Sequence, residues 1–347
     1  MTGQQRSLSR QTHAELVAET FYAPTRDGWR LAIHHWPRRA EPRRRHPILM
    51  VHGLGANRLN MDLDEQYSVA RAAARRGFDA FVLELRGAGL SMAPGGRNRR
   101  LFQWGFRDYA EIDMPAAIKA VLEVSGASSV HGLGHSMGGM LFYALGVRQP
   151  QYLRAIASVG TPLVEELELA PNEQRLVQLA TRLTPASSQR RVPLRSLMHT
   201  AGRFIPVSRR LVDGLLLNAN NTDSTVMARM AREAIDDIPL QLALELSRQM
   251  AARFNGKEGP PAYVYERELG KLTVPVYAVS GSADRLAPPS SVKACVRRIV
   301  NSPDVRYREM GVAFGDSANY GHIDLLVGRN APQEVYPTLL DFLEEVD

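Results

Sequence analysis

The chain of 347 residues has one cysteine, four lysines and no long apolar run. The single cysteine, Cys295, excludes an internal disulfide bond and any zinc site built from several cysteines. No apolar run approaches the roughly 20 residues that a membrane-spanning helix needs, and residues 1–19 lack the apolar stretch of a signal peptide. We therefore expect a cytoplasmic protein without a transmembrane segment, in which Cys295 packs within a helix.

Basic residues outnumber acidic ones, and the formal net charge is +7. Arginines cluster between Arg38 and Arg45, but Pro42 and Pro47 accompany them, which is typical of a solvated loop. The chain has neither basic residues interleaved with stacking aromatics nor a recognisable nucleic-acid-reading module. Because 44% of the residues are hydrophobic and 23% are charged, we expect a globular protein with no nucleic-acid partner.

Short apolar segments alternate with helical ones through much of the chain. This pattern predicts an α/β fold, a mostly parallel sheet with helices on both faces. The chain opens with a predicted hairpin whose turn is Asp27-Gly28. The predicted strands cover residues 19–23, 29–36, 47–51, 80–85, 128–133, 155–159 and 274–280.

Between about residue 163 and residue 272, leucine-rich amphipathic segments replace the strand pattern. Examples are residues 176–183 and 240–250, both with helical spacing of apolar side chains. We therefore divide the chain into three predicted parts. They are a flexible N-terminal segment (1–17), a core made of residues 18–162 and 271–347, and a helical cap (163–270).

The stretch from Val130 to Gly139 reads VHGLGHSMGG, in which a short apolar run turns at a serine flanked by glycines. Gly134 and Gly138 leave the space that a tight turn from a strand into a helix requires around Ser136. The apolar residues 140–145 that follow predict a buried helix. This context favours a catalytic role for Ser136 over an idle serine in a glycine-rich loop.

A serine becomes nucleophilic when a base takes its proton and a third group holds that base in position. Residues 274–281 predict a strand that ends shortly before Asp284, and ligands of open α/β sheets bind at such strand ends. His322 follows, so the order is serine, acid, histidine, as in one particular fold. Asp324 and Asp316 compete for the acid's role, but Asp324 lies only two residues from His322 and Asp316 lacks the strand-end context.

Asp284 and two other histidines also have structural alternatives. Asp284 is a possible cap for a helix that begins near Pro288 or Pro289. His52 and His135 lie beside the candidate site, where we expect them to pack or to bond loop backbone rather than to transfer protons. Which role Asp284, His52 and His135 have depends on contacts that form only in the folded chain.

Motifs for cofactors and metals are missing from the sequence. It has no H-E-x-x-H and no carboxylate–histidine spacing that would hold zinc. The Gly95-Gly96 loop lacks the lysine and the serine or threonine of a phosphate-binding P-loop. We therefore expect no metal, no ATP and no other cofactor.

Three further stretches carry recognisable patterns. Residues 51–55 read VHGLG, residues 84–91 read ELRGAGLS, and residues 322–328 read HIDLLVG. Together with the serine turn, they resemble the HG loop, the D-x-R-G-x-G-x-S segment and the histidine region of the α/β-hydrolase family. Glu84 replaces the usual aspartate and Ala88 the usual histidine. The H-x-D-[LF] pattern after the histidine resembles acid-lipase-like members, which favours lipases and esterases.

The resemblance covers roughly residues 19–162 and 270–345 and implies a serine hydrolase. It implies that the backbone N–H groups of Leu54 and Met137 form the oxyanion hole of a Ser136–Asp284–His322 triad. The expected reaction is cleavage of a small carboxylic ester with an apolar acyl or alcohol part, through an acyl-enzyme.

Several other functions remain open at this point. An acyltransferase or thioesterase would use the same triad, and so would a C–C bond hydrolase or a haloperoxidase of the wider family. A protein of a different class, a noncatalytic receptor for a small ligand, would keep the fold without turnover. The sequence leaves the substrate's chain length and the oligomeric state undetermined.

Overall fold

The computed structural model describes residues 18–95, 102–164, 167, 190–201, 217–255 and 261–347. The predicted flexible segment 1–17 lies outside these residues. Parts of the predicted cap also lie outside them, including the amphipathic segment 176–183.

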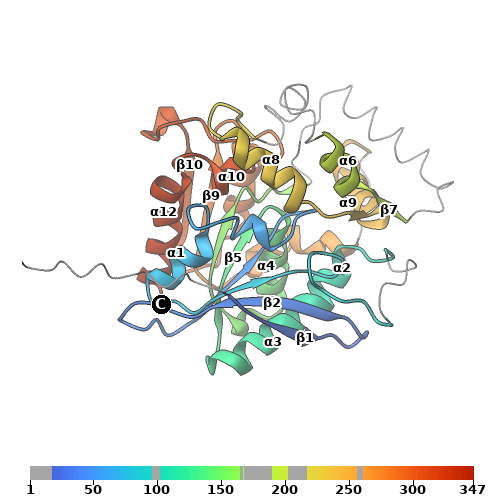
Figure 1. Ribbon diagram of the computed structural model, residues 1–347, viewed down its shortest axis with the longest axis horizontal. Helices are drawn as coiled ribbons and strands as arrows, with labels where there is room; N and C mark the ends of the chain where they lie inside the picture. The colour runs from blue at the N-terminus through green and yellow to red at the C-terminus, as the bar shows by residue number, and fades with distance from the viewer. Residues whose placement is uncertain (1–17, 96–101, 165–166, 168–189, 202–216, 256–260) are drawn as a thin grey trace, which may run out of the picture.

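Eight strands of the described chain form one sheet, which runs through the centre of the molecule (Figure 1). The strand order is β1-β2-β4-β3-β5-β6-β9-β10. Strand β2 pairs antiparallel with both β1 and β4, and every other neighbouring pair is parallel. The strands are β1 (Glu19–Pro24), β2 (Arg30–Trp36), β3 (Ile48–Val51), β4 (Ala80–Leu83), β5 (Val130–His135), β6 (Leu153–Val159), β9 (Val276–Gly281) and β10 (Val305–Met310).

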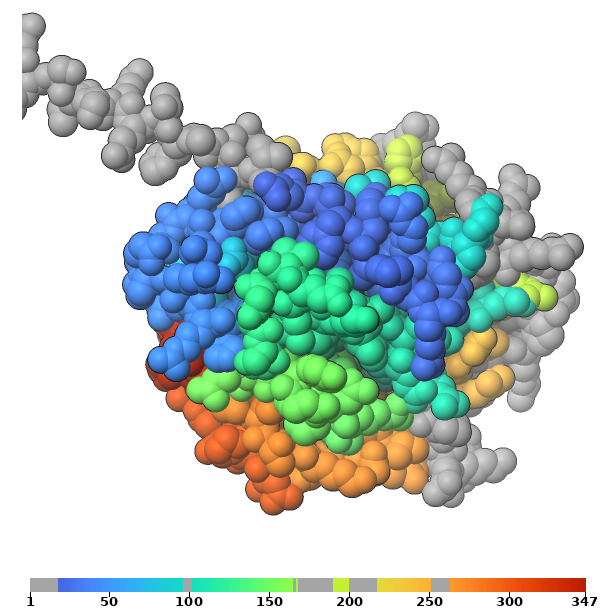
Figure 2. All heavy atoms as spheres, turned by 90° about the horizontal axis from the view of Figure 1, so that it is seen from below, coloured from blue at the N-terminus to red at the C-terminus, as the bar shows by residue number. Residues whose placement is uncertain are grey.

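The predicted N-terminal hairpin is confirmed as β1 and β2, and its turn includes Gly28 at a φ of +90°. Figure 2 shows this hairpin, in dark blue, against α3 (Met114–Ser125), in green. Strand β10 is absent from the predictions. Its sequence, VRYREM, places arginines at alternate positions, and the edge of the sheet tolerates them because one side of an edge strand faces solvent.

Helices cover both faces of the sheet, as predicted. Strand β3 shows why its sequence is apolar throughout, since Ile48 and Met50 pack on one face and Leu49 and Val51 on the other. The first face is covered by α1 and α12, and the second by α3, α4 and α10. Their bounds are α1 (Val69–Arg75), α4 (Met137–Arg148), α10 (Pro289–Arg298) and α12 (Ala331–Glu345).

Buried Cys295 lies in α10 and packs in the core, in agreement with the prediction.

The short helices lie mainly in the connections between these elements. None of the described helices is long and apolar enough to cross a membrane. The short helices of the connections are η1 (Arg58–Asn60), α2 (Phe106–Asp108), η2 (Tyr109–Asp113), η3 (Pro150–Tyr152), η9 (Val312–Phe314) and α11 (Asp324–Val327).

The described residues between β6 and β9, here called the inserted segment, contain helices and one small sheet. The helices α6 and α9 lie at the upper right of Figure 1, and α8 lies beside α6 at the top centre. The two-stranded antiparallel sheet of β7 and β8 is a feature that the sequence analysis does not predict. The elements are β7 (Arg191–Val192), α6 (Leu194–Ala201), α8 (Ser224–Glu233), β8 (Ile238–Pro239), α9 (Leu240–Asn255), η7 (Pro261–Glu266) and η8 (Leu269–Lys271).

Hydrogen bonds join the inserted segment to several loops of the core, two of which lie at the candidate site. Asp236 donates its backbone N–H to the carbonyl of Gly55, at 2.8 Å, in the loop after β3. Asn221 donates its side-chain amide to Asp324, at 2.8 Å, just after the loop that carries His322. Both loops lie at the carboxyl end of the sheet, so the inserted segment packs beside the candidate site.

Candidate active site

Ser136 lies in the turn between β5 and α4 with φ 54° and ψ −118°. It is the one non-glycine residue at positive φ in the described chain. Such a backbone is unfavourable for a residue with a Cβ, and it persists because the surrounding structure holds it. Its N–H donates to the carbonyl of Val159 at 2.8 Å, and its carbonyl accepts from Gly139 and Met140 in the first turn of α4. The side chain is half-buried.

The glycines around Ser136 are required by close backbone approaches. A Cβ on Gly134 would collide with the backbone of Gly138 and Gly139, and a Cβ on Gly138 would collide with the carbonyl of Val51. The helix α4 therefore begins directly against the ends of β3 and β5. This packing leaves the serine at the carboxyl end of the sheet, as the motif predicts.

Asp284 and His322 meet at the same end of the sheet. His322 donates from Nδ1 to one carboxylate oxygen of Asp284 at 2.8 Å, and the two residues are 5% and 3% exposed. The other oxygen accepts the N–H groups of Leu286 and Ala287. Asp284 is therefore no cap of α10, whose N-cap residue is Pro288. The carboxylate is held by backbone on one side and holds an imidazole on the other.

The two competing acids have other partners. Asp324 accepts from the N–H groups of Asn218 and Gly321 and from the Asn221 amide, and burial raises its pKa. Asp316 accepts from Arg308 and from the N–H of Gly311. In the described chain no hydrogen bond or ion pair joins either acid to His322, whose carboxylate partner is Asp284.

Val159, the last residue of β6, contacts Ser136, and the next residue, Gly160, lies close to His322. A Cβ on Gly160, beside Ser136's partner Val159, would lie 3.2 Å from His322 Nδ1 and 3.3 Å from the Asp284 carboxylate. No hydrogen bond joins the Ser136 hydroxyl to His322 in the described residues, and no partner is found there for His322 Nε2.

The loop after β3 lies against the serine. A Cβ on Gly53 would come within 3.3 Å of the Ser136 Cβ and 3.1 Å of His135 Nδ1. The Gly53 N–H donates to the side-chain oxygen of Asn60 at 3.1 Å, and His135 Nδ1 lies 3.0 Å from the same oxygen. Asn60 is a residue that the sequence analysis missed, because no motif marks it. The next residue after Gly53 is Leu54, half-buried at the same edge.

The two flanking histidines are buried, and burial lowers the pKa of each. His52 Nδ1 bonds the carbonyl of Gly53 at 2.8 Å, and its Nε2 accepts the N–H of Leu85. His135 Nε2 lies 3.2 Å from the carbonyl of His322, and the charge of His322 further lowers the pKa of His135. Both rings therefore bond loop groups, as expected.

The family model of the alpha/beta hydrolase fold matches residues 46–328, which is most of the chain. The chain belongs to the α/β hydrolase fold family. Human lipase member K is 24% identical to this α/β hydrolase over 367 residues, covering 94% of this chain and 88% of the lipase. Mouse gastric triacylglycerol lipase is 23% identical, covering 94% and 89% of the two chains.

A solved structure supports the same fold. The monoacylglycerol lipase of Paleococcus ferrophilus superposes with a TM-score of 0.61 at 16% identity. The match covers 91% of this chain and 99% of the lipase. At this level of identity, the likeness concerns the arrangement of strands and helices.

The segment ELRGAGLS of this α/β hydrolase has a structural role. Glu84 accepts the N–H of Leu90 at 2.6 Å and pairs with His34 at 3.2 Å. Burial opposes ionisation of Glu84, but His34 and the Leu90 N–H outweigh it and lower its pKa. A Cβ on Gly89 would collide with the Glu84 carboxylate. Glu84, which is longer than the aspartate usual at this position, therefore fills the space beside Gly89.

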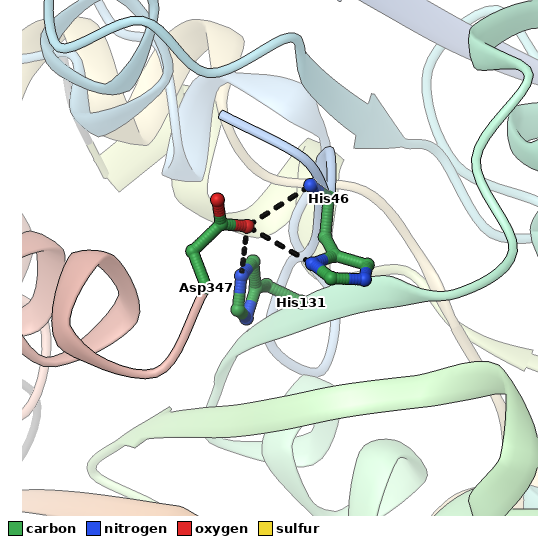
Figure 3. A group of neighbouring side chains, drawn as sticks. All are labelled: His46, His131 and Asp347. Carbon is green, nitrogen blue, oxygen red and sulfur yellow. Dashed lines mark hydrogen bonds and ion pairs between the residues drawn. The ribbon is translucent and has the colours of Figure 1, made fainter. Parts of the chain in front are cut away.

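A second histidine–carboxylate group of this α/β hydrolase lies at the amino ends of the strands. Figure 3 shows His46, His131 and Asp347, whose donor atoms lie within 4.8 Å of one another. One oxygen of Asp347 accepts from His131 Nε2 at 3.1 Å and from the ring and N–H of His46 at 3.0 and 2.9 Å. The other accepts the Arg45 N–H at 2.7 Å. Among the described residues, this is the one group spaced closely enough for a metal ion, and hydrogen bonds already occupy its carboxylate.

Proposed function

We propose that this α/β hydrolase cleaves a carboxylic ester through an acyl-enzyme on Ser136. His322 Nε2 takes the hydroxyl proton as Oγ attacks the carbonyl carbon, and it then gives that proton to the leaving alcohol. Water attacks the acyl-enzyme in the second half, with His322 again as the base. Asp284 holds the ring and stabilises the imidazolium. The supporting observation is that Ser136, at positive φ, and the 2.8 Å bond between His322 and Asp284 lie at the same carboxyl end of the sheet.

The proposed oxyanion hole consists of the backbone N–H groups of Leu54 and Met137. Met137 is the first residue of α4, and an N–H at this position has no acceptor within its own helix. Leu54 follows Gly53, which lies against Ser136. Donors placed where charge develops stabilise the transition state, and losing one costs about a hundredfold to a thousandfold in rate.

The proposed substrate is a small ester with an apolar acyl or alcohol part, and the proposed cap, residues 163–270, supplies apolar walls around it. The names of the relatives, lipase member K and gastric triacylglycerol lipase, support an ester of this class. The bonds from Asp236 and Asn221 to the two site loops support a cap position for the inserted segment.

The test combines fluorophosphonate labelling with hydrolysis of p-nitrophenyl esters of increasing chain length. Ser136→Ala is expected to lose both labelling and turnover, whereas Ser290→Ala, an exposed serine in α10, is the matched control and keeps both. Leu54→Ala is expected to stay active, because the proposed donor is its backbone N–H. Equal losses in Leu54→Ala and Ser136→Ala would contradict these assignments.

The same experiment separates the other functions. Labelling together with product release only after addition of an alcohol or only from a thioester would indicate an acyltransferase or a thioesterase. A wild-type protein that neither labels nor turns over would indicate a ligand-binding protein. A rate that is flat across chain lengths would contradict an apolar pocket.

A further inference from the structure

Asn60 is a buried side chain that joins two parts of the site. It ends η1 and is 4% exposed. Its side-chain oxygen accepts from the Gly53 N–H and lies 3.0 Å from His135 Nδ1. Because a peptide N–H can only donate, the Asn60 atom that faces Gly53 is the oxygen rather than the amide nitrogen.

The same oxygen also determines where the proton of His135 lies. A neutral imidazole has one N–H, and the ring faces two oxygens, Asn60 at 3.0 Å and the carbonyl of His322 at 3.2 Å. Burial keeps the pKa of His135 low and the ring neutral. The shorter contact is with Asn60, so we assign the proton to Nδ1, which leaves Nε2 in contact with the His322 carbonyl but without a hydrogen bond to it. Asn60 then accepts two hydrogen bonds from two different loops.

These two bonds end next to the two proposed oxyanion donors. Gly53 directly precedes Leu54, and His135 precedes Ser136 and Met137. One amide oxygen therefore sets the spacing between the loop after β3 and the turn after β5. In this arrangement each proposed donor lies one or two residues from a contact with the Asn60 oxygen.

We propose that Asn60 is a positioning residue that fixes the oxyanion hole by holding Gly53 and His135 at a set distance. The proposal rests on the proposed function and deepens it. Backbone donors cannot be removed by ordinary substitution, but the side chain that anchors them can. A displacement of about 1 Å at a reacting centre can cost about a hundredfold in rate.

The test measures kcat and KM on a p-nitrophenyl ester for Asn60→Leu and Asn60→Asp. Asn60→Leu keeps the branched shape and removes the acceptor, so we expect kcat to fall about 10- to 100-fold with KM nearly unchanged. Asn60→Asp keeps an oxygen that accepts both bonds but adds a buried negative charge, so we expect its kcat to lie between those of Asn60→Leu and the wild type. A general loss of packing would not distinguish the two variants in this way.

Thr25→Val is the matched control, because it removes a buried acceptor of a backbone N–H in another part of the molecule. Thr25 is 7% exposed, and its hydroxyl oxygen accepts the Trp29 N–H in the N-terminal hairpin. We expect Thr25→Val to lower stability, measured by thermal unfolding, while kcat stays near the wild-type value. If Asn60→Leu does not fold, Asn60→Ala, which removes the same acceptor with a smaller side chain, takes its place.

Three outcomes would overturn the positioning role. They are wild-type kcat in folded Asn60→Leu, an equal loss of kcat in Thr25→Val, and a kcat of Asn60→Asp that is no higher than that of Asn60→Leu. Failure of the proposed function is a separate result, because it would appear as a wild-type protein without turnover or as ester turnover that survives Ser136→Ala.

Discussion

A histidine–carboxylate group lies at each end of the parallel strands, and the two groups differ in what surrounds the histidine. At the carboxyl end, His322 is bound to Asp284 at 2.8 Å, and no partner of its Nε2 is found in the described residues. At the amino end, Asp347 bonds His131 at 3.1 Å and also takes the backbone N–H groups of Arg45 and His46.

The neighbours of the two groups explain the difference. Ser136, at positive φ, lies on the loop cluster around His322, and the adjacent glycines permit close approach. At the other end, the ring of Phe78 lies edge-on to His131, and α12 ends at the cluster. A histidine–carboxylate contact therefore indicates a catalytic site only where a nucleophile and an open ring nitrogen accompany it.

Replacing His322 and His131 should give the largest difference in kcat between the two groups. His322→Gln removes the proposed base, and we expect kcat to fall on the order of 10⁶-fold, as for a triad histidine that acts as a unit with its serine. His131→Gln is the control at the amino end, where we expect lower stability and nearly unchanged kcat. Steady-state hydrolysis of a p-nitrophenyl ester measures both. A similar loss of kcat in the two variants would break the comparison.

Replacing the two carboxylates should give the next largest difference. Asp284→Asn leaves the shape intact but no longer fixes the tautomer of His322, and we expect a loss in kcat on the order of 10⁴-fold. Asp347→Asn should leave kcat near the wild-type value. The same ester assay checks both, and full activity in Asp284→Asn would return the choice of acid to Asp316 or Asp324.

The smallest effect concerns stability at the amino end. Burial by itself would raise the pKa of Asp347, but hydrogen bonds from His131 and from the N–H groups of Arg45 and His46 outweigh burial and lower this pKa. A carboxylate whose pKa is lowered by folding stabilises the folded state above its unfolded pKa of about 3.9, and this contribution is lost as the pH falls through the folded pKa.

We therefore expect Asp347→Asn to lower the free energy of unfolding by about 1 kcal/mol at neutral pH. The difference from the wild type should shrink below about pH 4. Urea unfolding of both proteins at several pH values measures it. A difference that grows as the pH falls would show that the carboxylate is not stabilised by these donors.

Much of the fold could be predicted from local patterns. The hairpin, the apolar strands and the turn at Ser136 depend on residues near one another in the sequence, so their signals lie within short windows. Strand β10 was missed because an edge strand needs less apolar sequence. The domain boundaries at residues 163 and 270 and the catalytic roles remain predictions.

The sequence by itself determined that a serine lies in a tight strand-to-helix turn and that a parallel sheet supports it. Spacing of glycines and apolar residues specifies both, because backbone sterics and side-chain alternation act locally. Only the tertiary structure decided that Asp284 rather than Asp324 holds His322, and that Asn60 joins Gly53 to His135. These choices depend on hydrogen bonds between side chains that are distant in sequence, and such bonds have directions that only the packed chain defines.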